Sequence, residues 1–101
     1  MRLMIMFDLP TETAADRSDY AKFHRSLVKE GFIMMQQSIY CKLVMNPLAA
    51  ELAKQRVQHL SPNKGVIQAM IVTEKQYAQI EYLSGGTSTK QVNSTDRLVI
   101  F

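Results

Sequence analysis

The sequence predicts an α+β domain in which two helices cover one face of an antiparallel sheet. Short runs rich in β-forming residues are interspersed with two longer stretches whose apolar side chains recur at helical spacing. The order of these segments is strand, helix, strand, strand, helix, strand. The length of 101 residues and the apolar fraction of 47% are sufficient for one domain with one hydrophobic core.

The first predicted strand runs from Arg2 to Asp8 and is apolar on both faces. Because side chains alternate along a strand, Leu3, Ile5 and Phe7 share one face. Met4 and Met6 lie on the other face, together with Asp8. Both faces of this strand are therefore expected to be covered.

The first helix is predicted over residues 14–30, and Gly31 stands where such a helix would end. The stretch of residues 32–45 is rich in β-forming residues and is interrupted by "QQS", which predicts a hairpin of two strands. The apolar stripe of the helix consists of Tyr20, Phe23, Leu27 and Val28.

The second helix begins at Asn46, an N-cap residue, followed by Pro47 at the first helical position. A fourth strand is predicted over residues 66–73, and Thr73 has capping-box spacing to Gln76, which predicts a short helical turn. The apolar stripe of the second helix consists of Ala49, Leu52, Ala53, Val57 and Leu60.

The predicted organisation is a core domain of residues 1–84, a polar linker of residues 85–96 and a last strand, "RLVIF", of residues 97–101. This strand would add to the edge of its own sheet or of a partner's sheet, and the sequence leaves both open. Because the sequence ends inside a predicted strand, we expect a short native tail beyond Phe101.

The order of elements is the split βαβ pattern of the ferredoxin-like fold, in which two helices cover one face of the sheet. We expect Met4, Met6 and Tyr40 to form an apolar patch on the other, bare face. Large apolar patches usually mark association surfaces, so the sequence predicts a homodimer that packs sheet against sheet.

Composition excludes several classes of protein. No apolar run approaches the length of a membrane span, and no secretory signal is evident, so we expect a cytoplasmic protein and no membrane partner. The single cysteine, Cys41, has no partner for a disulfide and is predicted to be a small core residue. The net charge of +3 and the pI of about 9.2 are compatible with an anionic partner.

Asp8 is the one acidic residue for which the sequence supports a catalytic or metal-binding role. Common catalytic motifs are absent from the sequence. If the Met4 face meets a two-fold copy of itself, two Asp8 carboxylates would approach near the axis and could bind Mg²⁺ or Mn²⁺. The alternative is that Asp8 hydrogen-bonds backbone amides of the turn before Pro10.

Four basic residues are candidates for binding nucleic-acid phosphates. Arg17 stands at the start of the first helix, where backbone amides already favour anions, and Lys22 follows one to two turns later. Lys90 and Arg97 flank the polar linker and could reach the same rim of a dimer. The alternative for each of them is an ordinary solvated surface position.

The chain resembles the small CRISPR-associated spacer-acquisition proteins, also described as endoribonucleases, which are the non-integrase members of the adaptation pair. The resemblance covers essentially the whole chain. It rests on "MFDLP", on "DRSDYAKFHRSLVKEGFIMMQQSIYCK" and on the terminal "RLVIF". The second segment, with the short helix after "VIQAMIVTEKQY", is most similar to versions from Cas9-type (type II-A) systems.

This resemblance implies a ferredoxin-like homodimer whose last strand crosses to the partner, with Asp8 as a metal-linked aspartate at the dimer axis. It places Arg17 and Lys90 where relatives have arginines that contact the duplex backbone. The implied partners are an integrase subunit, double-stranded DNA and Cas9-type effector machinery.

Three functions follow for comparison. The favoured one is a non-catalytic bridge that holds prespacer DNA for insertion into the CRISPR array, since one carboxylate per subunit is little equipment for hydrolysis. The second is a Mg²⁺-dependent endonuclease acting on single-stranded RNA or duplex DNA through Asp8. The third is a ferredoxin-like regulatory or acylphosphatase-type module, against which "DLPTET" supplies an acid where a phosphate-gripping arginine is expected.

Overall fold

The computed structural model describes residues 1–85. Residues 86–101 lie outside the described residues, and with them Lys90, Arg97, nearly all of the predicted linker and the predicted last strand. The elements follow the predicted order: β1 (Arg2–Asp8), α1 (Ala14–Lys29), β2 (Ile33–Gln36), β3 (Ile39–Leu43), α2 (Pro47–Leu60), β4 (Val66–Val72) and a short α3 (Glu74–Ala78).

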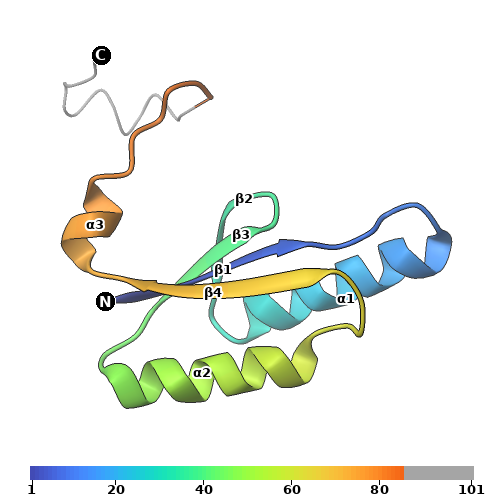
Figure 1. Ribbon diagram of the computed structural model, residues 1–101, viewed down its shortest axis with the longest axis horizontal. Coiled ribbons are helices and arrows are strands. Elements are labelled where there is room, and N and C mark those ends of the chain that lie inside the picture. The colour runs from blue at the N-terminus through green and yellow to red at the C-terminus, as the bar shows by residue number, and fades with distance from the viewer. Residues whose placement is uncertain (86–101) are drawn as a thin grey trace.

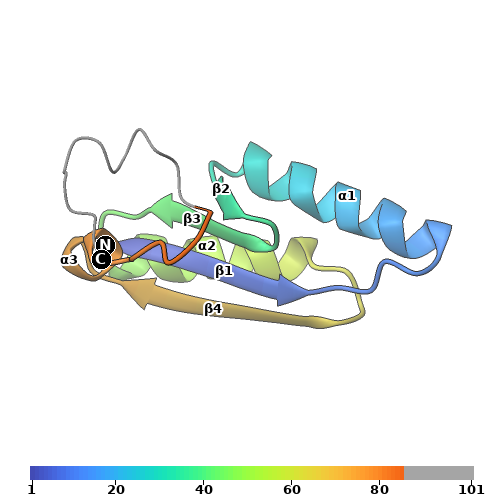
Figure 2. The ribbon, with the colours of Figure 1, turned by 90° about the horizontal axis from the view of Figure 1, so that it is seen from above.

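The four strands form one antiparallel sheet in the order β2-β3-β1-β4, which is visible in Figure 2. α1 and α2 lie on the same side of this sheet (Figure 1). The predicted ferredoxin-like α+β arrangement is therefore confirmed. Because β1 is central, its two faces decide what is buried between sheet and helices and what remains on the open face, opposite the helices.

α2 and α3 begin at the capping residues that the sequence predicts, Asn46 and Thr73. α1 begins with a capping box that was not predicted from the sequence. The Thr13 hydroxyl accepts a hydrogen bond from the Asp16 amide at 3.0 Å, and the Asp16 carboxylate accepts one from the Thr13 amide at 3.3 Å. Asn46 caps α2 with Pro47 behind it. Thr73 and Gln76 form the predicted capping box of α3.

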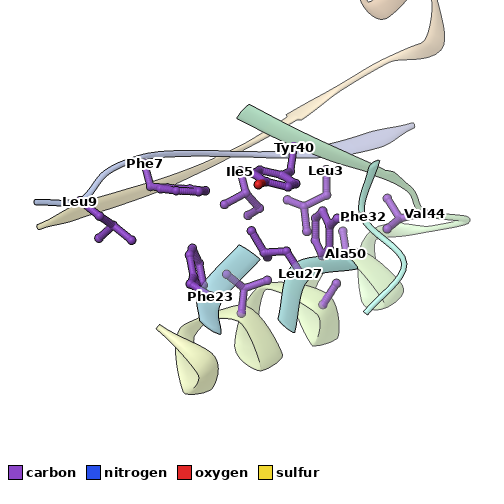
Figure 3. Packing of buried hydrophobic residues seen from close by; sticks show 12 residues of the cluster. Leu3, Ile5, Phe7, Leu9, Phe23, Leu27, Phe32, Tyr40, Val44 and Ala50 are labelled. Carbon is purple, nitrogen blue, oxygen red and sulfur yellow. The ribbon is translucent and has the colours of Figure 1, made fainter. Parts of the chain in front are cut away.

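The core lies between β1 and the two long helices, as Figure 3 shows. Leu3, Ile5 and Phe7 of β1 are buried, which confirms the predicted inward face of this strand. Phe23 and Leu27 of α1 pack beneath them. The remaining helical contribution comes from α2, through Ala50, Ala53 and Val57.

Tyr40 does not lie on the open face of the sheet, and that part of the sequence prediction is wrong. Its side chain is 1% exposed and belongs to the core. The reason is the register: Tyr40 pairs with Ile5, and directly paired residues of antiparallel strands share a face. The open face instead receives Cys41, which pairs with Met4.

The predicted helical stripes were too wide. Val28 is 50% exposed, Leu52 45% and Leu60 40%, because α1 and α2 each bury only a narrow strip against the sheet. Cys41 is buried and unpaired, as predicted, although it lies on the open face. Within residues 1–85, no helix has the length and hydropathy of a membrane span.

Candidate functional site

Asp8 is the last residue of β1, at the end of the strand that leads into the loop before α1 (Figure 1). It is exposed and shares the open face with the half-buried Met4 and Met6, as predicted. Within residues 1–85 its carboxylate makes no hydrogen bond and no ion pair. The hydrogen bonds that the turn interpretation requires are thus absent from the described part of the chain, and the carboxylate is available to a ligand.

The residue before Asp8 is held firmly by an aromatic cluster. The Phe7 ring is stacked on Tyr40 with a centroid separation of 5.6 Å and meets Phe23 edge to face at 5.0 Å. The Phe7 amide donates to the Ser38 carbonyl oxygen at 3.1 Å, beyond the regular ladder. The backbone that presents Asp8 is therefore anchored from both the core and the β2–β3 turn.

Polar contacts fasten the same cluster to α1. The Tyr20 hydroxyl and Ser38 Oγ share a hydrogen bond of 2.8 Å, and the Tyr40 hydroxyl shares one with His24 Nδ1. Burial, together with the nearby Tyr20, raises the pKa of the Tyr40 phenol. No local pattern in the sequence indicates the contact between His24 and Tyr40, which lie 16 positions apart.

Gly65 lies directly before the neighbouring strand, β4, and packs closely against Asp8. A Cβ at this position would lie 2.4 Å from the Asp8 carbonyl oxygen and 2.8 Å from the Leu9 side chain. The φ angle of Gly65 is +73°, a conformation that L-residues rarely adopt. Both facts require glycine at the position directly before β4, next to the end of β1.

Asp8 is the candidate metal ligand, and the described part of the chain places no cluster of further ligands around it. Among the described residues no group of three or more His, Cys, Asp or Glu side chains could hold a metal ion. Carboxylate oxygen is the donor type that Mg²⁺ and Mn²⁺ prefer. Asp8 would supply one carboxylate ligand to such an ion, and water, a second copy of the chain or a substrate would supply the other oxygen ligands.

Arg17 lies at the start of α1 and closes the loop that follows Asp8. Its Nη1 donates to the carbonyl oxygens of Thr11 and Glu12, both at 3.1 Å. The Nε and Nη2 groups make no hydrogen bond within residues 1–85. Arg17 thus holds the loop through Nη1, while its Nε and Nη2 groups remain available to a ligand.

Lys22 lies further along α1, exposed and without an ion pair within the described residues. The two other predicted phosphate ligands, Lys90 and Arg97, lie outside residues 1–85. Of the predicted site residues, Asp8 therefore lies at the end of β1, and Arg17 and Lys22 lie on α1. The positions of Lys90 and Arg97 stay predictions.

The acidic residues of α1 are all bound by cations from the other half of the chain. Lys64 Nζ lies 2.8 Å from Asp16 Oδ1 and 2.9 Å from Asp19 Oδ2. The hydrogen bond from Lys64, assisted by the one from the Thr13 amide, lowers the pKa of the Asp16 carboxyl. Glu30, at the end of the helix, is paired with Arg56 at 2.7 Å.

The open face of the sheet carries much exposed apolar surface. Met70, which pairs with Met4, is 53% exposed, and Val66, which pairs with Asp8, is 57% exposed. Ile33 and Leu43 on the same face are 66% and 55% exposed. A surface of this kind is typical of association.

One end of the open face is covered by α3, through a contact that the sequence did not predict. Arg2 Nε lies 3.1 Å from Glu74 Oε2, and its guanidinium lies 3.9 Å from the centroid of the Tyr77 ring. Arg2 Nη1 also approaches Cys41 Sγ at 3.9 Å. The sequence feature that could have indicated this contact is Arg2, a charged residue in the otherwise largely apolar strand β1.

Comparison with known proteins agrees with the sequence resemblance. The family described as "CRISPR associated protein Cas2" matches residues 1–80. A protein of Ligilactobacillus salivarius named "CRISPR-associated endoribonuclease Cas2" is 45% identical over 100 residues, which cover 99% of both chains. A protein of the same name from Streptococcus mutans is 46% identical over 99 residues, covering 98% of this chain and 91% of the relative.

Among solved structures, the crystal structure of Streptococcus pyogenes Cas2 at pH 6.5 superimposes with a TM-score of 0.65 at 20% identity. The match covers 83% of this chain and 100% of that one. At this identity the match supports the fold. The family match, together with relatives at 45% identity over nearly the full length, shows that the chain belongs to the Cas2 family of CRISPR-associated proteins.

Proposed function

We propose that this chain is a homodimeric subunit of CRISPR adaptation that bridges integrase subunits and holds double-stranded prespacer DNA by its phosphate backbone. The observation that carries this proposal is the pairing pattern of the charges. Exposed cations at the start and along the outside of α1 have no acidic partner within residues 1–85, and β1 contributes a single carboxylate, that of Asp8, which also has no partner there.

The dimer in this proposal forms through the open face of the sheet. Met4, Met6 and Met70 lie there side by side on paired strands, and thioether side chains adapt well to packed interfaces. Burying this surface against a second copy removes exposed apolar area from water, which favours association. Tyr40 takes no part in this interface, because it is buried in the core of its own chain.

The DNA in this proposal is held without reading its sequence. Arg17 presents Nε and Nη2, and Lys22 presents an unpaired ammonium group. Lys90 and Arg97 remain proposed members of the same surface. Contacts of this type are to phosphates, so affinity falls as salt rises and depends little on base sequence.

A second candidate function is a Mg²⁺- or Mn²⁺-dependent endonuclease acting on single-stranded RNA or duplex DNA. The specific observation in its favour is the exposed Asp8 carboxylate, without a partner within residues 1–85 and on the proposed dimer face. The relatives' printed name, endoribonuclease, points the same way. A bound divalent ion would activate water and neutralise phosphate charge, and Asp8 of each subunit would hold it.

The cellular setting is part of the proposal. We propose a cytoplasmic location, where phage DNA and the CRISPR array are both accessible. The partners are an integrase subunit and duplex DNA, with Cas9-type effector machinery as a further one. These assignments rest on the Cas2 family membership and on the sequence resemblance, and pull-down of each component with the intact chain tests them.

The deciding experiment is a cleavage and binding assay on the same protein samples. Labelled RNA and duplex DNA are incubated with Mg²⁺ or Mn²⁺ and wild type or Asp8→Asn, and duplex binding is titrated over a salt series with and without integrase. Salt-sensitive binding that strengthens with integrase, without cleavage, supports the bridge. Cleavage by the wild type that Asp8→Asn loses while still binding would establish the nuclease instead.

A further inference from the structure

The outer face of α1 carries three cations, of which only Lys22 belongs to the candidate site. Lys22, Arg25 and Lys29 recur at spacings of three and four residues, so they project from one side of the helix. All three are exposed. Phe23 and Leu27, which are buried beneath the sheet, occupy a different face of the same helix. We call Lys22, Arg25 and Lys29 the α1 stripe.

None of the three cations has an acidic partner within residues 1–85. The reason lies in how the fold distributes charge. Asp16 and Asp19 are both bound by Lys64, and Glu30 is bound by Arg56. The acids on and next to α1 are therefore neutralised from α2 and the loop that follows it, and the cations on the outside keep their full charge.

Because the acidic side chains are paired elsewhere, the α1 stripe presents three positive charges on one side of a helix. From Lys22 to Lys29 the helix rises by about 10.5 Å. Phosphates of one DNA strand follow each other every ~3.4 Å along the duplex axis, so the stripe spans about three phosphate steps. A helix presents such charges at fixed spacing, which reduces the entropy lost on binding a regular polyanion.

We propose that Arg25 and Lys29, in line with Lys22, bind the phosphate backbone of duplex DNA and extend the contact surface along the length of α1. This inference rests on the proposed DNA-holding function and deepens it. The α1 stripe would form one continuous contact surface on each subunit, from Lys22 to Lys29, and Arg17 would add a separate contact at the start of the helix.

The test compares duplex binding by wild type with the double variant Arg25→Gln/Lys29→Gln over a salt series. Glutamine has a helix propensity close to those of arginine and lysine, so α1 should form normally. Each lost phosphate contact lowers the slope of log affinity against log salt by about 0.9, so we expect a drop of about 1.8 and, at 0.1 M salt, an affinity loss on the order of 60-fold.

The matched control is Lys54→Gln/Lys75→Gln, which removes the same two charges from α2 and α3. Lys54 is only in an exposed pair with Glu51, and Lys75 has no partner within residues 1–85. Thermal melting of all three proteins checks the fold, because Lys29 also lies in the last turn of α1, where a cation favours the helix.

The outcomes separate this inference from the function on which it rests. A reduced slope in the α1 variant and an unchanged slope in the control support the stripe. If wild type binds and both variants bind equally well or lose affinity equally, the stripe is overturned while the DNA-holding function stands. If wild type itself shows no salt-sensitive duplex binding, the proposed function fails and the stripe fails with it.

Discussion

Gly65 packs against the backbone of Asp8 so closely that a Cβ on residue 65 would lie 2.4 Å from the Asp8 carbonyl oxygen. This approach fixes the end of β1 against the start of β4, where Asp8 pairs with Val66. The position of the candidate carboxylate therefore depends on a residue that carries no functional group.

Gly65→Ala should destabilise the protein strongly. The left-handed φ of +73° costs an alanine about 1 to 2 kcal/mol, and overpacking against backbone adds about 1 to 3 kcal/mol. The free energy of unfolding, measured by urea titration, should fall by the sum. Gly85→Ala is the control, because φ is +75° there with no atom within 4 Å. Equal losses in the two variants would contradict the close approach at Gly65.

Asp8→Asn should leave stability nearly unchanged. The carboxylate is exposed and makes no hydrogen bond or ion pair within residues 1–85, so removing its charge should shift the free energy of unfolding by less than about 0.5 kcal/mol. Urea titration in the absence of divalent ions measures this. A loss of more than about 1 kcal/mol would indicate that Asp8 is a structural turn residue after all.

Stability at low pH should depend on Lys64. Because the pKa of Asp16 in the folded chain is lowered from its ordinary value of 3.8, its contribution is present above that pH and is lost as pH falls through the folded-state value. Lys64→Gln removes the main cause of this lowering. Unfolding midpoints between pH 2 and 6 should therefore decline less steeply in the variant, and identical profiles would count against the Lys64–Asp16 contact.

Tyr40→Phe should cost about 1 kcal/mol through loss of the hydrogen bond with His24. It should also flatten the alkaline loss of stability. Since burial raises the pKa of Tyr40 above its ordinary value of 10.0, its contribution is present below pH 10 and is lost as pH rises through the folded-state value. Unfolding midpoints of wild type and Tyr40→Phe at pH 8 and above test this, and parallel pH profiles would contradict it.

Arg2→Lys should loosen α3 while leaving the rest of the sheet intact. Lysine keeps the charge but loses the planar group that lies over Tyr77 and meets Glu74. Hydrogen exchange of amides in residues 74–78 should accelerate, and amides in β1 and β3 should keep their protection. Unchanged exchange in α3 would show that Arg2 does not hold it.

The element order was predictable because its signals are local. Helix starts were predicted from pairs of residues close together in the sequence, Asn46 with Pro47 and Thr73 with Gln76. Both helices, α2 and α3, begin at these positions. The face of Tyr40 was not predictable in the same way. β3 offers two neighbouring apolar residues, Tyr40 and Cys41, and only its register with β1 decides which one enters the core.

The candidate site was predictable in part. Asp8 stood out because a carboxylate ends an apolar strand, and its open-face position follows from strand alternation. Contacts between distant segments gave no such signal. Lys64 and Asp16 are 48 positions apart, and nothing near either residue indicates that they meet. The sequence alone therefore could not predict that the cations of α1 lack acidic partners within residues 1–85.

The central position of β1 in the sheet has a consequence for synthesis on the ribosome. β1 is the first strand made, yet its partner β4 begins 58 positions after Asp8, at Val66. At about 5 to 20 residues per second, translation leaves one side of the central strand unpaired for roughly 3 to 12 seconds. During that interval one edge of this apolar strand is unpaired, so it can pair with a wrong strand before β4 has been made.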